Sequence, residues 1–401
     1  MRAFRSDLSA VFLDRPNRYL VRALSGGRIV EAYCPNPGRL AELLLPGCEL
    51  LLERAPAATG SRAAPRKTSL TLVACRHPGT GVVVPLYATR SNALARELVL
   101  PRLFPDALEV RAEAPLGASR IDFRIDLPEA SRAWLEVKTC TLIEHGVAMF
   151  PDAPTTRGLR HVEELAKLAK LAKLAAAAEG AGRARSHILF VLMGPGARRM
   201  VPNVHTDPDF AFGLLRLEGR LELHAASFRS RADGLVRLER LGLPVDLDPI
   251  RRLKAAGYSP RNVGGVYLLV LVLRRPRTVE VGGLGRLRFP EGGYVYVGSA
   301  LRGLASRLGR HLRQRKRMHW HIDYLRAVAD DVEGFPIVSR SRLECALARD
   351  IAAVADGEVP GFGCSDCDCR SHLYRFVEDP RRTPAFVGVL LRYRHVVSLE
   401  S

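Results

Sequence analysis

The sequence predicts a multidomain protein with a small β-barrel followed by two α/β units. Three observations lead to this fold class. At 401 residues the chain exceeds one ordinary domain. Short apolar runs separated by turn residues fill residues 8–88, whereas helical periodicity begins at Ser91. The stretch from residue 241 to 258 is typical of a connector, and a further α/β pattern follows it. We therefore expect domains at 1–88, 89–240 and 259–401, joined by a linker at 241–258.

The first domain is predicted from five apolar runs, at residues 19–24, 28–33, 49–53, 69–74 and 81–87. Glycine- and proline-rich turns at 25–27, 35–38 and 77–79 separate them. Five short strands within about 80 residues favour a barrel of the OB type, a common platform for nucleic acid. A plain β-sandwich is the alternative.

The second domain is predicted to have the element order α-β-β-β-α-β. A helix begins at Ser91, with Ser91 or Asn92 as its N-cap. Strands are expected at 108–112, 120–127 and 133–143, then a long helix at 158–179 and a buried strand at 186–193.

Two carboxylates and a lysine on neighbouring predicted strands form the main candidate site: Asp122, Glu136 and Lys138. Glu136 and Lys138 are two residues apart, so their side chains point to the same face of a strand. Such a group suits Mg²⁺ or Mn²⁺ and a water molecule activated to cleave a phosphodiester. A surface salt bridge between Glu136 and Lys138 is the alternative. It fits poorly, because apolar neighbours place both charges in a buried strand, where unpaired charge is costly.

The composition favours a polyanionic partner. There are 61 Lys and Arg residues against 42 Asp and Glu, a formal charge of +19. Nucleic acid is the first candidate and an anionic membrane surface the second, although an arginine excess also arises from GC-rich coding. The chain opens without an apolar signal segment, has no run long enough to span a bilayer, and has only eight cysteines. A cytoplasmic protein with reduced thiols is expected.

Residues 1 to about 240 resemble the sugar fermentation stimulation protein A family. The resemblance lies in residues 17–21, 34–40, 120–123, 135–142 and 150–165. It implies an OB-like domain followed by a PD-(D/E)XK nuclease-like domain, with DNA binding and inferred nuclease activity. Under it, Asp122 and Glu136 would bind the metal, and Lys138 would orient or deprotonate the attacking water.

The same resemblance makes Glu97 an accessory acid and Arg39 a phosphate contact. Arg157 and His161 lie at the start of the predicted long helix, where free N–H groups favour an anion such as the scissile phosphate. The alternative function is a non-catalytic, DNA-binding regulatory protein on a nuclease-derived scaffold.

The third domain looks like the GIY-YIG nuclease pattern. Gly265-Val266-Tyr267 would be its first motif and Tyr296-Val297-Gly298 its second, with Arg307 on the following helix and Glu344 on a later one. The resemblance implies Tyr267 and Tyr296 as catalytic tyrosines, Arg307 as a phosphate stabiliser and Glu344 as a metal ligand. The two motifs are farther apart than in the compact pattern, so residues 279–290 are expected to form an extra hairpin. Residues 264 to about 376 also resemble an uncharacterised family related to GIY-YIG domains, the DUF123 type, through motifs at 289–300, 319–325 and 361–373.

Two further features of the third domain are ambiguous. Residues 302–317 carry seven Lys or Arg and no acid. We interpret five of them as a nucleic-acid track, against a merely solvated face: Arg310, Arg313, Arg315, Lys316 and Arg317. Cys364, Cys367, Cys369 and His372 have ligand types that suit Zn²⁺, with His319 or His321 able to complete the set. The spacing is tight, so packing of turn residues is favoured over zinc.

The sequence thus predicts a metal-dependent nuclease of DNA or RNA.

Overall fold

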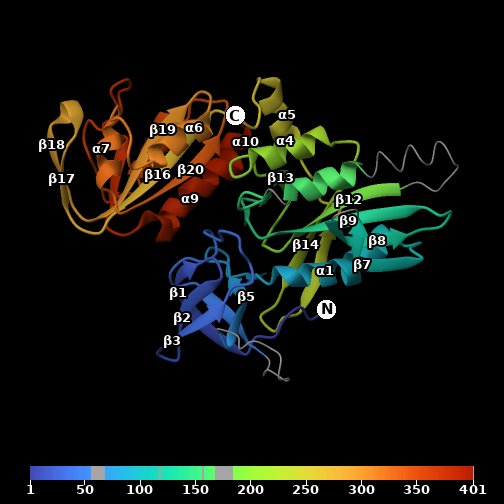
Figure 1. The fold of residues 1–401 in the computed structure, drawn as a ribbon. Helices are drawn as coiled ribbons and strands as arrows, with labels where there is room; N and C mark the ends of the chain where they lie inside the picture. Colours follow the sequence, from blue (N-terminus) through green and yellow to red (C-terminus); the bar gives the residue numbers. More distant parts are fainter. Residues whose placement is uncertain (56–67, 117–118, 156–157, 168–183, 401) are drawn as a thin grey trace. The chain divides into compact units, whose positions relative to one another are not determined.

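The computed structural model describes residues 1–55, 68–116, 119–155, 158–167 and 184–400 (Figure 1). The chain divides into two compact units. The first contains Met1–Asn203 and Asp209–Asp248, and the second contains Val204–Pro208 and Pro249–Ser401. Among the described residues, no helix combines the length and the apolar character needed to cross a membrane.

A closed five-stranded barrel begins the first unit. Its strands run in the order β3-β2-β1-β4-β5, and parallel pairing of β3 with β5 closes the ring. They are β1 (Leu8–Asn17), β2 (Leu20–Ser25), β3 (Arg28–Tyr33), β4 (Glu49–Arg54) and β5 (Leu70–Arg76). Alternate side chains, such as Val21 and Ala23 on β2, are buried in the barrel.

The predicted set of five strands differs from this barrel at both ends. β1 was not among the five predicted strands. Its buried side chains are Ala10 and Phe12 in the first half, and its second half is mostly polar, so the strand shows no long apolar run. Residues 81–87 contribute instead the short strand β6 (Val83–Pro85), which pairs with β5 and, through Val83 and Ser230, with β14 (Glu222–Ser230).

The central sheet continues in the order β14-β12-β9-β8-β7. Its strands are β7 (Glu109–Leu116), β8 (Ser119–Asp126), β9 (Arg132–Cys140) and β12 (Ala184–Leu192), with β15 (Val236–Leu241) on the outer side of β14. The first three form an antiparallel meander, and β12 returns parallel to β9. This strand order and direction match the α-β-β-β-α-β core that the sequence predicts.

The helical segment before β7 starts differently from the prediction. It comprises η1 (Ala88–Arg90), α1 (Ser91–Leu94), η2 (Ala95–Val99) and α2 (Leu100–Leu103). Arg90 is the N-cap residue of α1, and it makes no side-chain cap bond. The prediction of Ser91 or Asn92 as N-cap was therefore wrong, since both lie inside the helix and their side chains bond to the sheet instead.

The predicted long helix at 158–179 is described only in part. Residues 158–167 are helical, and the remainder of the predicted helix lies outside the described residues. The other elements of this unit are a three-stranded sheet and a helix: β10 (Ile143–Glu144), β11 (Val147–Phe150), β13 (Arg199–Pro202) and α4 (Pro208–Arg216).

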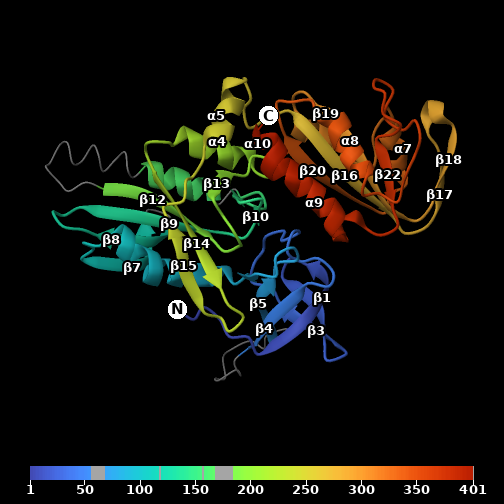
Figure 2. The ribbon, with the colours of Figure 1, turned by 180° about the vertical axis from the view of Figure 1, so that it is seen from behind.

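The second unit is built on a five-stranded sheet in the order β20-β16-β19-β22-β21. The strands are β16 (Gly265–Leu273), β19 (Gly292–Ala300), β20 (Asp331–Val338), β21 (Gly357–Glu358) and β22 (Leu373–Phe376). A separate hairpin, β17 (Arg277–Glu280) and β18 (Arg286–Phe289), extends beyond this sheet (Figure 2). It occupies the region where the sequence predicts an inserted hairpin.

Helices complete the second unit, and α5 lies in the region expected to be a linker. They are α5 (Asp248–Ala255), η3 (Gly282–Leu284), α6 (Leu304–Leu312), α7 (His321–Val328), α8 (Glu344–Ala352), η4 (Pro380–Arg382), α9 (Pro384–Arg392), η5 (Tyr393–Val397) and α10 (Ser398–Glu400). The unit has its own apolar core, in which Val295, Ile337 and Phe386 are fully buried.

Candidate functional site

Asp122 on β8 and Glu136 on β9 face each other where the two strands separate. The antiparallel register pairs Phe123 with Leu135, so the next position along the strands sets Asp122 opposite Glu136. The ladder ends before that position. The backbone N–H of Val137 donates instead to Oδ2 of Asp122, at 2.7 Å.

Two cationic or polar groups converge on one oxygen of Glu136. Nζ of Lys138 donates to Oε1 at 2.7 Å, and Nδ1 of His161 lies 2.8 Å from the same atom. The second oxygen, Oε2, is buried and has no hydrogen-bond partner among the described residues. A buried, unpaired carboxylate oxygen is costly unless a further ligand satisfies it.

The pKa values of the two carboxyl groups shift in opposite directions. Burial raises the pKa of Asp122, and the charge of Glu136 raises it further, against hydrogen bonds from Val137 and Asn92. For Glu136, burial also acts to raise the pKa, but Lys138 and His161 outweigh it and the net pKa is lowered. Glu136 is thus held as a carboxylate, whereas Asp122 retains a proton more readily than an ordinary aspartate.

This arrangement fits a divalent cation. Mg²⁺ and Mn²⁺ prefer carboxylate oxygens, and Asp122 and Glu136 are two carboxyl groups on adjacent strands with Oε2 of Glu136 still unsatisfied. Lys138 supplies a compensating positive charge beside them.

Sequence reasoning missed two polar residues of α1 that hydrogen-bond to side chains of β8 and β9. Nδ2 of Asn92 donates to Oδ1 of Asp122 at 2.8 Å, and Oγ1 of Thr139 donates to Oγ of Ser91 at 2.7 Å. Both helix residues were interpreted as caps. The feature of the sequence that could have identified their role is a pair of polar side chains at the start of the helix that precedes the candidate strands.

The other predicted residues of the first unit differ in where the structure places them. Glu97 is exposed on η2, and no recorded interaction between described residues links it to Asp122 or Glu136. The side chain of Arg39 is exposed, while its backbone N–H hydrogen-bonds to Asp152. Arg157 lies outside the described residues. His161 does join the site, but as a neighbour of Glu136.

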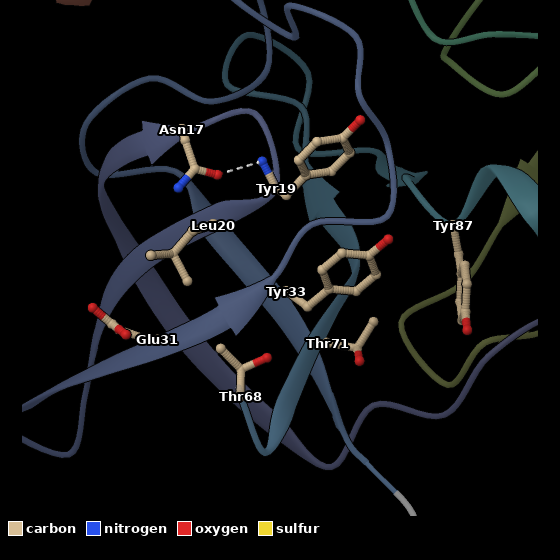
Figure 3. Close-up of a pocket in the computed structure, with 8 residues that line it drawn as sticks. All are labelled: Asn17, Tyr19, Leu20, Glu31, Tyr33, Thr68, Thr71 and Tyr87. Atoms are coloured by element: carbon tan, nitrogen blue, oxygen red, sulfur yellow. Dashed lines mark hydrogen bonds between the residues drawn. The ribbon is translucent and has the colours of Figure 1, made fainter. Parts of the chain in front are cut away.

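A cavity of about 690 Å³ opens beside the barrel. Tyr19, in the turn between β1 and β2, and Tyr33, at the end of β3, are 49% and 44% exposed, and Tyr87 also lines the cavity (Figure 3). The backbone N–H of Tyr19 donates to Oδ1 of Asn17 at 2.9 Å, which holds the strand turn that presents the first ring. Exposed tyrosine faces on an OB barrel are suited to stacking against bases.

In the second unit, Tyr267 and Tyr296 pack around His311. The two tyrosine ring centroids are 6.4 Å apart, and the centroid of His311 lies 5.6 Å from Tyr267 and 6.4 Å from Tyr296. A Cβ at Gly298 would come within 2.4 Å of the Tyr267 hydroxyl, so the tyrosine of the first motif fits only against a glycine in the second.

Burial acts against ionisation of both tyrosines. It raises their pKa values well above the usual range, and each is raised further by acidic neighbours or by the other tyrosine, with Arg307 opposing. Burial also lowers the pKa of His311 to about 4, with Lys316 contributing, so this imidazole is neutral near pH 7. His311 was not a predicted site residue. The feature of the sequence that could have identified it is its position on the predicted helix that carries Arg307.

Glu344 is an electrostatic neighbour of both tyrosines and of Arg307, and it also lines a cavity. It lies at the start of α8, where the Ser299 hydroxyl donates to its Oε2 and Nδ1 of His372 lies 3.3 Å from its Oε1. Glu344, Ser299 and His372 line a cavity of about 370 Å³, which Tyr267, Tyr296 and Arg307 do not line. The guanidinium of Arg307 instead stacks 4.6 Å from the ring centroid of Trp320.

Two of the five cations in the predicted nucleic-acid track are engaged inside the unit. Arg310 donates to both oxygens of Asp323, at 3.1 and 2.9 Å, and Nζ of Lys316 lies 2.9 Å from the same carboxylate. The Asp323 side chain is fully buried, so these pairs hold α6 and its exit loop to α7. Arg313, Arg315 and Arg317 are exposed and form no ion pair with any described residue. Of the five, these three remain candidates for contact with phosphates.

The predicted cysteine cluster is also rearranged. Cys345 on α8 joins Cys367, Cys369 and His372, whereas Cys364 is not part of that group. His321 is turned to the loop, where its Nδ1 accepts from the backbone N–H of Gly363 at 3.3 Å.

Three family models match successive parts of the chain. Residues 13–84 match the SfsA N-terminal OB domain, and residues 89–233 match the sugar fermentation stimulation protein RE domain. Residues 266–392 match DUF123, a domain of unknown function. The order is an OB domain, a central core and a C-terminal DUF123 domain.

Curated relatives cover the first half of the chain. The sugar fermentation stimulation protein homologue of Methanothermobacter thermautotrophicus is 35% identical over 211 residues, which span 52% of this chain and 80% of that protein. The homologue of Moorella thermoacetica is 37% identical over 211 residues, 51% of this chain and 82% of that protein. The solved structure of Pyrococcus furiosus SfsA in complex with Ca²⁺ has a TM-score of 0.49 at 26% identity, covering 61% of this chain and 99% of that one.

Proposed function

The chain belongs to the sugar fermentation stimulation protein family, and on this premise we propose that its central domain is a metal-dependent nuclease that hydrolyses phosphodiester bonds in DNA or RNA. One observation carries the proposal. Oε2 of Glu136 is buried and has no partner in the part of the chain that the structure describes, in a group that also contains Asp122 and Lys138. A bound divalent cation would satisfy such a carboxylate oxygen.

Asp122 and Glu136 would hold Mg²⁺ or Mn²⁺. When bound, the ion would lower the pKa of a coordinated water and neutralise charge that develops on the phosphate. The chain's own residues have distinct tasks. Lys138 and His161 keep Glu136 ionised. The N–H of Val137 and the amide of Asn92 fix the orientation of Asp122. The ammonium of Lys138 has further donors with which to orient a water or a phosphate oxygen.

The barrel would bind the substrate through its exposed tyrosines. Tyr19, Tyr33 and Tyr87 offer aromatic faces around one cavity, and stacking on such faces tolerates any base. The formal charge of +19 supplies the long-range attraction to phosphates. Both features suit single-stranded DNA or RNA.

The rival function is a regulator that binds DNA on a nuclease-derived scaffold without turnover. A scaffold has no need of an unsatisfied carboxylate oxygen, which costs stability when it is buried. Oε2 of Glu136, for which the described residues supply no partner, therefore favours the nuclease.

A second cleavage site in the C-terminal domain stays a prediction. In its favour, Gly298 leaves room for the Tyr267 hydroxyl and Glu344 lines a cavity. Against it, burial of both tyrosines opposes the ionisation that a catalytic base needs.

The proposal is tested with end-labelled single-stranded, duplex and structured DNA and RNA, incubated with the full chain in Mg²⁺, Mn²⁺ or EDTA. Cleavage of at least one substrate with a metal, and none with EDTA, is expected. Binding of the same substrates without any cleavage in either metal would support the regulator instead. A Tyr267→Phe variant run in parallel separates the two candidate sites, because it leaves the central domain unchanged.

A further inference from the structure

Three thiols and one imidazole meet in the C-terminal domain, outside the site described above. The ligand atoms of Cys345, Cys367, Cys369 and His372 all lie within 4.8 Å of one another. Cys345 comes from the first turn of α8, and the other three come from the segment between β21 and β22. All three cysteines are free thiols.

The geometry of His372 resembles that of a metal ligand. Its Nε2 lies 3.5 Å from Sγ of Cys367. A sulfur and a nitrogen bound to one tetrahedral zinc are about 3.6 Å apart, from Zn–S and Zn–N distances of about 2.3 and 2.05 Å. The other ring nitrogen, Nδ1, lies 3.3 Å from Oε1 of Glu344. A ligating histidine typically directs its second nitrogen to a carboxylate in this way, which fixes the ring and its tautomer.

Backbone hydrogen bonds and one buried apolar side chain hold the loop that supplies three of these residues. Between β21 and β22 only Phe362 is a buried hydrophobic residue, while Ser365, Asp366 and Asp368 are exposed. Gly361 and Gly363 have positive φ angles of 74° and 73°, so the backbone turns sharply here. A segment with so little apolar packing of its own gains order from a bound metal.

We propose that Cys345, Cys367, Cys369 and His372 bind one Zn²⁺ as a structural site. Four protein ligands leave no open position for a substrate or water, which is the mark of a structural rather than a catalytic zinc. The soft thiolates and the imidazole favour zinc over the Mg²⁺ proposed for the central domain. The inference goes beyond the proposed nuclease, because the site lies in a different unit.

Zinc at this position would also organise the neighbouring cavity. It would tie the start of α8 to the loop, and Glu344 is the residue directly before Cys345. Glu344 contacts both Ser299 and the ligand His372, so the metal would fix the carboxylate in the cavity wall. Glu344 thus becomes a positioning residue for the zinc.

The test exploits the difference between Cys345 and Cys364. The full chain is purified under reducing conditions without metal-affinity steps, and its zinc and iron are measured by mass spectrometry. Parent, Cys345→Ser and Cys364→Ser are compared. Cys345 is exposed, so its replacement removes no core packing, and far-ultraviolet circular dichroism checks the fold of each variant.

One zinc per chain is expected in the parent and in Cys364→Ser, with most of it lost in Cys345→Ser. Cobalt added to the metal-stripped parent should give a thiolate-to-cobalt charge-transfer band that weakens in Cys345→Ser alone. Glu344→Ala should bind zinc about 10- to 100-fold more weakly, as other losses of a histidine's carboxylate partner do. The proposal is overturned if the reduced parent takes up neither zinc nor cobalt, if it holds iron instead, or if Cys364→Ser loses the metal while Cys345→Ser keeps it.

Discussion

Asn92 on α1 and Asp122 on β8 are joined by a hydrogen bond in which Nδ2 of the amide donates to Oδ1 of the carboxylate at 2.8 Å. The contact links the helix to the candidate metal site, and it favours the ionised form of Asp122 against the effect of burial. The acid limb of catalysis should depend on this bond, because a protonated Asp122 cannot hold a cation.

Replacing Asn92 with Ala should move the acid limb of the pH profile of kcat/KM to higher pH. Burial already raises the pKa of Asp122, and the amide lowers it. Without the amide the pKa rises further, so activity is lost at a higher pH as the solution is acidified. Well above the limb, the variant should approach the parent rate. Ser91→Ala is the control, since Ser91 bonds to Thr139 and not to Asp122. A limb that stays in place or moves to lower pH would contradict this prediction.

Asp323→Asn should destabilise the C-terminal unit by about 3–5 kcal/mol, because it leaves two paired cations without their buried counter-charge. Arg310 and Lys316 both bond to this carboxylate, whose side chain is fully buried. Thermal unfolding of the full chain measures the effect on the transition of this unit. Glu280→Gln, at an exposed carboxylate, is the control and should leave that transition unchanged.

The same carboxylate predicts a pH dependence of stability. Burial acts to raise the pKa of Asp323, but hydrogen bonds from Arg310 and Lys316 outweigh it and hold the pKa well below its ordinary 3.8. The stabilisation is therefore present above the pKa of the unfolded chain and is lost as the pH falls through the lower folded value. The parent transition should weaken on acidification toward that range, and the Asp323→Asn transition should not show this component.

Arg313, Arg315 and Arg317 should contribute to the salt dependence of binding. Changing all three to Ser should flatten the slope of log affinity against log salt by roughly 0.9 for each lost phosphate contact on duplex. Fluorescence anisotropy at several salt concentrations gives the slope. Arg286→Ser with Arg288→Ser removes exposed charge from the hairpin instead. If the control flattens the slope equally for each charge removed, the salt dependence reflects net charge and not contacts made by Arg313, Arg315 and Arg317.

Tyr19 and Tyr33 should bind bases by stacking. Tyr33→Ala should weaken binding of a single-stranded oligonucleotide by roughly 1–3 kcal/mol, the usual cost of losing one stacked base. Tyr33→Phe keeps the ring and should bind like the parent, and Tyr19 should behave in the same way. If Phe costs as much as Ala, the hydroxyl rather than stacking is responsible.

Local sequence patterns were sufficient to find the strands of the central core and the group of Asp122, Glu136 and Lys138. Each strand carries a clear apolar run, and two residues of the group share one strand. His161 was predicted from its place at a helix start, but its contact with Glu136 depends on how that helix packs on the sheet. Asn92 was interpreted as a helix cap, because its contact with Asp122 likewise depends on how its helix packs on the sheet.

Contacts between segments account for the other differences. Cys345 is far in sequence from Cys367, and only the fold brings α8 to that loop, so spacing alone pointed to Cys364. Arg310 and Lys316 lie in a run without acids, yet their partner Asp323 comes from the next helix. A run of like charges therefore does not establish that its side chains are exposed, because a neighbouring helix can supply a buried acid that pairs with them.

The central claim is tested most directly by measuring metal-dependent cleavage by Asp122→Asn and Glu136→Ala beside the parent. The matched control is Asp106→Asn, which changes an exposed aspartate outside the site. Cleavage in Mg²⁺ should fall by about 100-fold or more in both site variants, since the cation supplies charge stabilisation and the activated water. Substrate affinity should stay within a few-fold, and Asp106→Asn should cleave like the parent. If Glu136→Ala cleaves as fast as the parent, Glu136 does not hold a catalytic metal and the central domain is not the nuclease proposed.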